Sequence, residues 1–155
     1  MLQELIQLIK LLFQSSPKKC NSLEIKQMKY FPFKGYFAMS WCGKLITKYS
    51  EKLNEETIIH ETIHLKQAQQ YSSWILYYLK YFNEWLKGKP FIKPYKSAYY
   101  TIPFEVEAYA NENDKNYIIN YNPINLKEKY TLNNRKELFK KYKSFQYWKQ
   151  YIQNL

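Results

Sequence analysis

The two histidines of this chain, His60 and His64, stand four residues apart, and Glu61 directly follows the first of them. Positions i and i+4 lie on one face of an α-helix, one turn apart, so a helix brings both imidazoles to one place. Two imidazoles arranged in this way can bind a single metal ion. The segment His60-Glu61-Thr62-Ile63-His64 therefore constrains the fold more than any other part of the chain, because its pattern is meaningful only in a helix.

The residues around this segment favour such a helix. Asn54 is a good N-cap, and two glutamates follow it in the first turn, where the helix dipole favours negative charge. Apolar residues at 58, 59, 63 and 65 supply the sides that pack into a core, while Thr57, Gln67 and Ala68 share the face of the histidines. We expect the helix to continue without a break to about Lys87, where Gly88-Lys89-Pro90 ends it.

The rest of the chain predicts a mainly helical α+β fold in one domain, residues 1–155. Two short strands are expected at 36–41 and 44–47, joined by a turn at 42–43, so that a small, two-stranded sheet precedes the helix of the histidines. Residues 15–34 carry two prolines and little periodicity, which indicates an irregular connector. Further helices are expected at 1–13, from Pro103 to about Asn120, and from Asn133 or Asn134 through Trp148.

The two histidines and Glu61 together form the HExxH pattern of zinc metallopeptidases. Glu61 lies about 100° around the helix from His60, close enough to reach a water activated by the metal without being a ligand itself. Zinc lowers the pKa of such a water, and a carboxylate can take its proton. The pattern therefore predicts a Zn²⁺ site in which His60 and His64 are ligands and Glu61 is the general base of a hydrolase that cuts peptide bonds. Fe, Co, Ni or Mn would also suit two histidines and a carboxylate.

A catalytic zinc site needs a third protein ligand, and the chain has no third histidine. The segment 102–112 offers the best carboxylates, and we choose Glu105, with Glu107 and Glu112 as alternatives. Glu105 shares a helix face with the small Ala108, which would let this helix approach the histidine helix closely. Glu107 is about 200° from Glu105, so the two cannot both face one metal, and we expect Glu107 to be mostly solvated.

These two segments together resemble the gluzincin group of zinc metallopeptidases, in which HExxH supplies two ligands and a downstream Glu in an ExxA segment supplies the third. The residues that carry the resemblance are HETIHLKQ at 60–67 and FEVEA at 104–108. The chain is more closely similar to short bacterial zincin-like proteins with HExxHxxQ and a later FExEAYANE, over roughly residues 36–114. The resemblance implies a zincin-like fold, bound zinc and Glu105 as the third ligand.

The resemblance also gives Tyr109 a role. Many gluzincins carry an Asp four residues after the ligand Glu, where it accepts a hydrogen bond from a ligand histidine, and here that position is Tyr109. A tyrosine hydroxyl can accept from an imidazole N–H, so we expect Tyr109 to orient a ligand histidine, more weakly than a carboxylate would. Without a third histidine, stabilising an oxyanion falls to a tyrosine, and the candidates are Tyr95, Tyr99, Tyr100 and Tyr109.

Lysine supplies nearly all of the net charge of +11, because Arg135 is the only arginine. Proteins that read nucleic-acid sequence favour arginine for its bidentate fork. We therefore expect a solvated, lysine-rich surface with no specific nucleic-acid partner, and a peptide or protein as the substrate. Cys20 and Cys42 have no paired spacing, which indicates reduced thiols in a cytoplasmic protein.

Two apolar helices raise the question of a membrane. Residues 1–13 predict an amphipathic helix that we expect to pack on the core, with a helix lying in a membrane surface as the alternative. The apolar stretch 74–86 would be about 20 Å long, too short for a bilayer core of about 30 Å, and we expect it to be buried. Together with the basic surface, these helices motivate a second hypothesis, a non-catalytic zincin-fold binding or regulatory module at an anionic membrane. Glu61 argues against it, because a purely structural metal site has no use for a general base.

Overall fold

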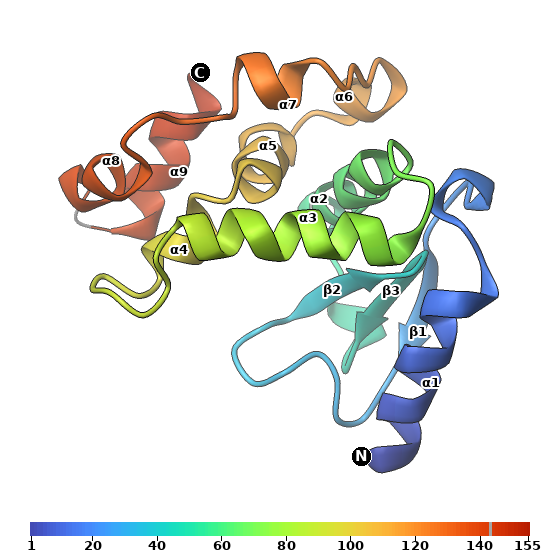
Figure 1. Ribbon diagram of the computed structural model, residues 1–155. Coiled ribbons are helices and arrows are strands. Elements are labelled where there is room, and N and C mark those ends of the chain that lie inside the picture. Colours follow the sequence, from blue (N-terminus) through green and yellow to red (C-terminus); the bar gives the residue numbers. More distant parts are fainter. Residues whose placement is uncertain (143) are drawn as a thin grey trace. The chain divides into compact units, whose positions relative to one another are not determined.

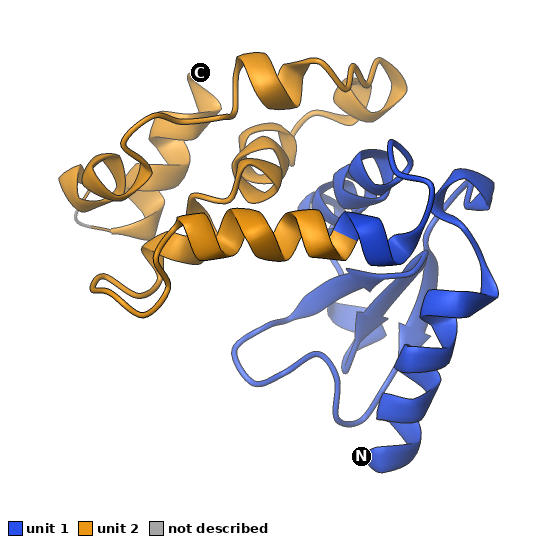
Figure 2. Cartoon of the chain, in the orientation of Figure 1, with its two compact units in different colours: residues 1–77 blue, residues 78–155 orange. Residues whose placement is uncertain are grey.

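The computed structural model describes residues 1–142 and 144–155. The chain forms two compact units, residues 1–77 and 78–155, and the boundary falls within the helix α3 (Figure 2). The expected α+β class is confirmed: helices predominate, and the described strands form a small sheet that precedes the histidine helix in the chain (Figure 1). A single domain spanning residues 1–155 stays a prediction.

The first unit consists of α1 (Leu2–Gln14), β1 (Glu24–Gln27), β2 (Ala38–Trp41), β3 (Lys44–Thr47), α2 (Glu55–Ala68) and the start of α3 (Trp74–Lys87), with short 3-10 helices at Pro17–Lys19 and Ser50–Lys52. The second unit consists of the rest of α3, α4 (Ser97–Tyr100), α5 (Pro103–Asn111), α6 (Lys115–Ile119), α7 (Asn125–Glu128), α8 (Arg135–Lys141) and α9 (Phe145–Gln153).

The sheet of the first unit has the strand order β1-β3-β2 among the described residues. The predicted hairpin is confirmed: β2 and β3 pair antiparallel, and Cys42 and Gly43 both have positive φ, as a two-residue hairpin turn requires. The prediction of two strands is wrong, because β1 adds to β3 in parallel within the segment expected to be irregular. The four residues of β1 are mostly exposed and include one apolar side chain, Ile25, so the strand is too short and too polar for its pattern to mark it.

The helix α1 packs on the sheet through one narrow side. Leu8 is buried in a cluster with Met28, Phe31 and Ile46, and the indole N–H of Trp41 donates to the carbonyl oxygen of Leu8 at 2.8 Å. The packing expected for this helix is therefore present, although most of its apolar residues remain exposed: Leu2, Leu5, Ile6, Ile9 and Phe13.

The long helix expected from residue 54 to 87 is wrong, because the chain breaks between α2 and α3 at residues 69–73. Ser73 sits at the break, and its hydroxyl oxygen accepts a hydrogen bond from the N–H of Leu76 at 3.3 Å. Serine disfavours helix interiors and favours this capping position because its side chain competes for backbone hydrogen bonds.

Two further expected helices are also split in the second unit. The helix expected from Pro103 begins there but ends at Asn111, and Asp114 then caps α6 by accepting from the N–H of Asn116 at 2.9 Å. The last expected helix is divided into α8 and α9, and Ser144 caps α9. At each break, a residue that favours an N-cap begins the next helix.

The core of the second unit is aromatic. One core cluster consists of Val106, Tyr130, Leu132, Trp148 and Ile152, and α5 packs against α9. The expectation that the stretch 74–86 is buried is wrong, because α3 buries only the side that carries Trp74, Tyr77 and Glu84. Periodicity of apolar residues does not distinguish a helix that is buried all round from one whose second apolar side faces solvent.

Candidate metal centre

The helix α2 presents the two histidines. Its first turn is capped by the side chain of Asn54, which accepts from the N–H of Thr57 at 2.9 Å, as expected. Ile63 and Leu65 are buried and anchor the helix, and only 7% of His60 and 6% of His64 is exposed. The helix is thus placed by its apolar side, while both imidazoles lie together on another side.

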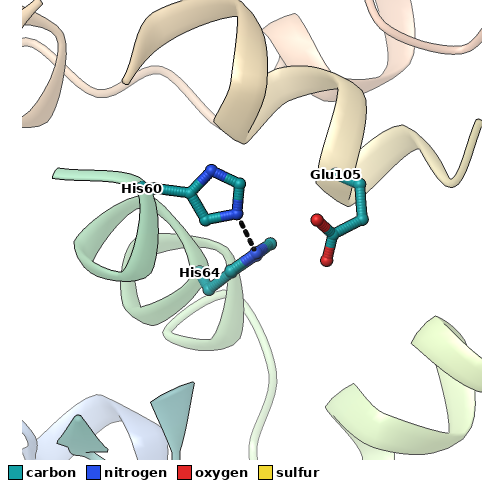
Figure 3. Close-up of side chains that lie close together, drawn as sticks. All are labelled: His60, His64 and Glu105. Atoms are coloured by element: carbon teal, nitrogen blue, oxygen red, sulfur yellow. Dashed lines mark hydrogen bonds between the residues drawn. The ribbon is translucent and has the colours of Figure 1, made fainter. Parts of the chain in front are cut away.

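The imidazoles face each other through the nitrogens that would bind a metal. The two Nε2 atoms are 3.2 Å apart and share a hydrogen bond (Figure 3). Zinc binds imidazole nitrogen at about 2.0–2.1 Å, so two ligands in tetrahedral geometry hold their nitrogens about 3.3 Å apart. The spacing of the histidine pair therefore fits a single ion without a change in the backbone.

Gln67 orients His64. The Nδ1 atom of His64 lies 2.8 Å from Oε1 of Gln67, and the hydroxyl of Tyr77 donates to the same oxygen at 3.4 Å. An amide oxygen can only accept, so the proton of His64 is on Nδ1 and its Nε2 carries the lone pair that a metal needs. The sequence places Gln67 on the helix face of the histidines but predicts no role for it. Its position three residues after His64 is the signal that could have indicated this hydrogen bond.

Glu61 is held by the sheet. Its side chain is 7% exposed, and its Oε2 accepts a hydrogen bond from the backbone N–H of Ser40 at 2.6 Å. Ser40 belongs to β2, the edge strand next to α2, where outward N–H groups are not used in strand pairing. This contact fixes one carboxylate oxygen of Glu61 against the sheet.

All three carboxylates proposed as the third ligand are buried in the second unit: Glu105 is 2% exposed, Glu107 0% and Glu112 5%. The expectation that Glu107 is solvated is wrong, because its Oε1 accepts from the hydroxyl of Tyr117 at 2.7 Å. In one unbroken helix, positions 107 and 117 would be about 15 Å apart along the axis, so this contact depends on the break between α5 and α6. Glu112 forms an ion pair with Lys149.

Glu105 is held by an aromatic side chain of α3. The hydroxyl of Tyr81 donates to Oε1 of Glu105 at 2.6 Å, and the ring of Tyr81 stacks on Phe104 with the ring centroids 5.9 Å apart. A carboxylate held through one oxygen keeps a fixed direction for the other, which is the property that a metal ligand requires.

Figure 3 draws the three predicted ligands, His60, His64 and Glu105. His60 and His64 are buried on α2 in the first unit, and Glu105 is buried on α5 in the second. The choice of Glu105 over Glu107 and Glu112 as the third ligand stays a prediction. Two imidazoles and one carboxylate are a ligand set that zinc accepts in catalytic sites.

Tyr109 lies in the aromatic core of the second unit. Its ring contacts Phe145 at 5.1 Å and Tyr100 at 6.0 Å between centroids. Burial, and then the nearby Glu105 carboxylate, raise the pKa of Tyr109, and the same two causes raise the pKa of Tyr100. Both hydroxyls therefore stay protonated at neutral pH and are able to donate hydrogen bonds. The role of Tyr109 in orienting a histidine stays a prediction, as does the choice among the four tyrosines for an oxyanion.

Compared with protein-family models, with curated proteins and with solved structures, the chain gives no significant match. The resemblance to the gluzincins therefore depends on the two motif segments, and the family stays a prediction.

Proposed function

We propose that this protein is a zinc-dependent hydrolase that cuts peptide bonds. His60, His64 and Glu105 would hold the metal, and Glu61 would act as the general base. The observation that carries this proposal is the pair of buried imidazoles with their Nε2 atoms 3.2 Å apart, on the helix that also supplies Glu61. The burial of Glu105 and its hydrogen bond from Tyr81 support the choice of third ligand, together with the ExxA pattern.

Each residue around the site would have a separate role. When bound, zinc acts as a Lewis acid that polarises a carbonyl group and lowers the pKa of a water. Glu61, fixed through one oxygen by the N–H of Ser40, takes a proton from the attacking water and passes it to the amine that leaves. Gln67 keeps His64 in the tautomer that exposes Nε2, and Tyr81 fixes the direction of the Glu105 carboxylate.

The alternative is a non-catalytic binding module on the same zincin-like scaffold. A structural site needs only ligands, whereas this helix places a buried carboxylate, Glu61, one position after a ligand and holds it by a backbone hydrogen bond. This arrangement favours an enzyme. The cytoplasmic location inferred from the two cysteines belongs to the same proposal.

Glu61→Gln separates the two functions. The substitution keeps the shape of the side chain but removes the base, so zinc content should stay at about one per chain while hydrolysis falls by at least ~10²-fold. Zinc is measured by elemental analysis and by competition with a chelator, and hydrolysis by mass spectrometry of a peptide library. The matched control is Glu56→Gln, an exposed glutamate on the same helix, which should change neither quantity.

Equal cleavage by the Glu61→Gln and native proteins would contradict the proposed mechanism. If the native protein binds zinc but cleaves no member of the library, the binding module becomes the better-supported hypothesis. If the native protein fails to bind zinc at neutral pH, both hypotheses are wrong.

A further inference from the structure

The second unit exposes a set of large apolar side chains that its own core leaves uncovered. They are Leu79, Phe82 and Leu86 on α3, together with Phe91 and Ile92 in the loop that follows, and their exposed fractions run from 43% to 80%. Trp85 joins the two groups, because its ring contacts Phe82 at 5.4 Å and Phe91 at 5.9 Å. We call the five exposed residues, without Trp85, the α3 face. A contiguous apolar surface rimmed by polar residues marks an interaction site.

The loop of the α3 face, after α3 in Figure 1, is held in place. The backbone of Gly88 lies so close to Ala98 that a Cβ at this position would come within 2.7 Å of the Ala98 Cα. Lys136 donates from its ammonium group to the carbonyl oxygen of Lys89 at 3.0 Å and also to that of Ile92. Phe91, the most exposed of the five at 80%, is therefore presented to solvent by an anchored backbone.

Lysines predominate among the charged residues of α3 and of the loop that follows it. Exposed lysines stand along and beside it: Lys80, Lys87, Lys89, Lys93 and Lys96. Glu84 is the only acidic residue from 74 to 96, and it is buried in ion pairs with Arg135, Lys80 and Lys87. The segment that carries the α3 face is therefore basic.

We propose that the α3 face docks this protein on an anionic lipid surface. An apolar helix side with lysines at its edges is the pattern of helices that lie in the plane of a bilayer, where lysine stems extend towards the headgroups. A second copy of this chain would bring a like-charged rim against the first, which charge repulsion disfavours. None of the helices in the described part of the chain combines the length and apolar character that crossing a bilayer requires. This proposal does not depend on the metal site.

Co-sedimentation with vesicles tests the proposal. The full chain should bind vesicles of phosphatidylcholine and phosphatidylglycerol in equal parts, and it should bind pure phosphatidylcholine at least about tenfold more weakly. Raising the salt from about 0.05 M to about 0.5 M should reduce binding to the mixed vesicles, because it screens the lysines. Equal binding to both vesicle types, or none to either, would overturn the proposal.

Two double variants show which face is used. Phe91→Ser with Ile92→Ser should lower binding to the mixed vesicles at least about tenfold, because two large apolar side chains are no longer transferred from water into the bilayer. The matched control, Ile9→Ser with Phe13→Ser, removes two similarly exposed side chains from α1 and should bind like the native protein. The reverse result would move the contact to α1 and overturn the assignment.

Two further measurements keep this test decisive. Far-UV circular dichroism and the melting temperature should be the same for the loop variant and the native protein, because both substituted side chains are exposed. In a separate variant, Phe91→Trp, the added indole should be quenched by brominated lipid in the mixed vesicles if the loop enters the bilayer. Sedimentation velocity without lipid should give a monomer for the native protein. A dimer that the loop variant abolishes, or an unquenched indole in bound protein, would contradict lipid docking.

Discussion

At the scale of single residues, the contact between Gln67 and His64 decides which ring nitrogen of His64 carries the proton. Without the amide oxygen 2.8 Å from Nδ1, His64 would be free to turn or to carry its proton on Nε2. An imidazole protonated on Nε2 cannot bind a metal through that atom. Residues that orient a ligand in this way affect metal affinity although they never touch the metal.

Gln67→Ala should therefore lower zinc affinity by roughly 10- to 100-fold, the usual range for losing a residue that orients a ligand. Zinc titration against a competing chelator measures this effect. The matched control is Gln70→Ala, an exposed glutamine one turn after Lys66 on the outer side, which should leave zinc affinity unchanged. Equal affinity for Gln67→Ala and the native protein would mean that His64 does not depend on this contact.

The third ligand is also decided by single residues. Glu105→Ala should weaken zinc binding by more than the roughly 100-fold upper range for an orienting residue, because it removes a ligand. Glu107→Ala should leave zinc affinity as it is but lower the free energy of unfolding by about 1–3 kcal/mol, because the partly buried hydroxyl of Tyr117 loses its charged acceptor.

Chelator competition and urea unfolding of both variants distinguish these outcomes. If Glu107→Ala loses zinc and Glu105→Ala keeps it, the ligand is Glu107. If both variants bind zinc like the native protein, Glu112 or Cys42 becomes the candidate.

At the scale of elements, the helices α3 and α8 are joined by the ion pair of Glu84 and Arg135, whose nearest atoms are 2.8 Å apart. Burial alone would raise the pKa of Glu84, but hydrogen bonds from Lys87, Arg135 and Lys80 outweigh it and lower the pKa from 4.5 to about 2. A carboxyl whose pKa is lower in the folded chain stabilises the fold above its unfolded pKa. That stability is lost as the pH falls from about 4.5 through about 2.

Glu84→Gln should therefore flatten the pH dependence of folding. Between about pH 5 and about pH 2, the free energy of unfolding of the native protein should fall more steeply than that of the variant. Urea unfolding followed by circular dichroism at several pH values measures both slopes. Glu137→Gln, an exposed glutamate on α8, is the control and should follow the native slope. Parallel curves for Glu84→Gln and the native protein would show that this ion pair does not link folding to pH.

At the scale of the whole molecule, a bound metal should stabilise the folded chain by mass action. Zinc at about 100 times its dissociation constant adds about 2.7 kcal/mol to the free energy of unfolding, provided that the unfolded chain does not bind it. Removing zinc with a chelator at pH 7.5 should lower the melting temperature by several degrees, because about 1 kcal/mol shifts it by about 2–4 °C in a chain of this size.

The shift on chelation should disappear as the pH falls below about 6, because protonated imidazoles do not bind metal. Differential scanning calorimetry with and without chelator measures it at each pH. In the control His60→Ala, chelation should leave the melting temperature unchanged. A chelator effect of equal size in this variant would place the metal elsewhere in the chain.

Features specified by neighbouring residues were readable from the sequence. The helix of the histidines follows from Asn54 and the i, i+4 spacing, and the hairpin follows from the turn at Cys42-Gly43. The N-caps Ser73, Asp114 and Ser144 are also local signals, and they would have located the three breaks that the apolar periodicity concealed. Each of these features depends on residues within a turn or two of each other, so the sequence alone determines them.

Contacts between distant segments were decided only by the tertiary structure. These contacts join residues from 10 to 24 positions apart. The strand β1 pairs with β3, the N–H of Ser40 donates to Glu61, and the hydroxyls of Tyr81 and Tyr117 donate to Glu105 and Glu107. A carboxylate has the same helix position whether it is solvated or buried against a hydroxyl, and only the packing of other elements chooses between these states. For that reason the sequence identified His60, His64 and Glu61 as a candidate site. The arrangement that fixes Glu61, and the burial of all three carboxylates on and after α5, required the folded chain.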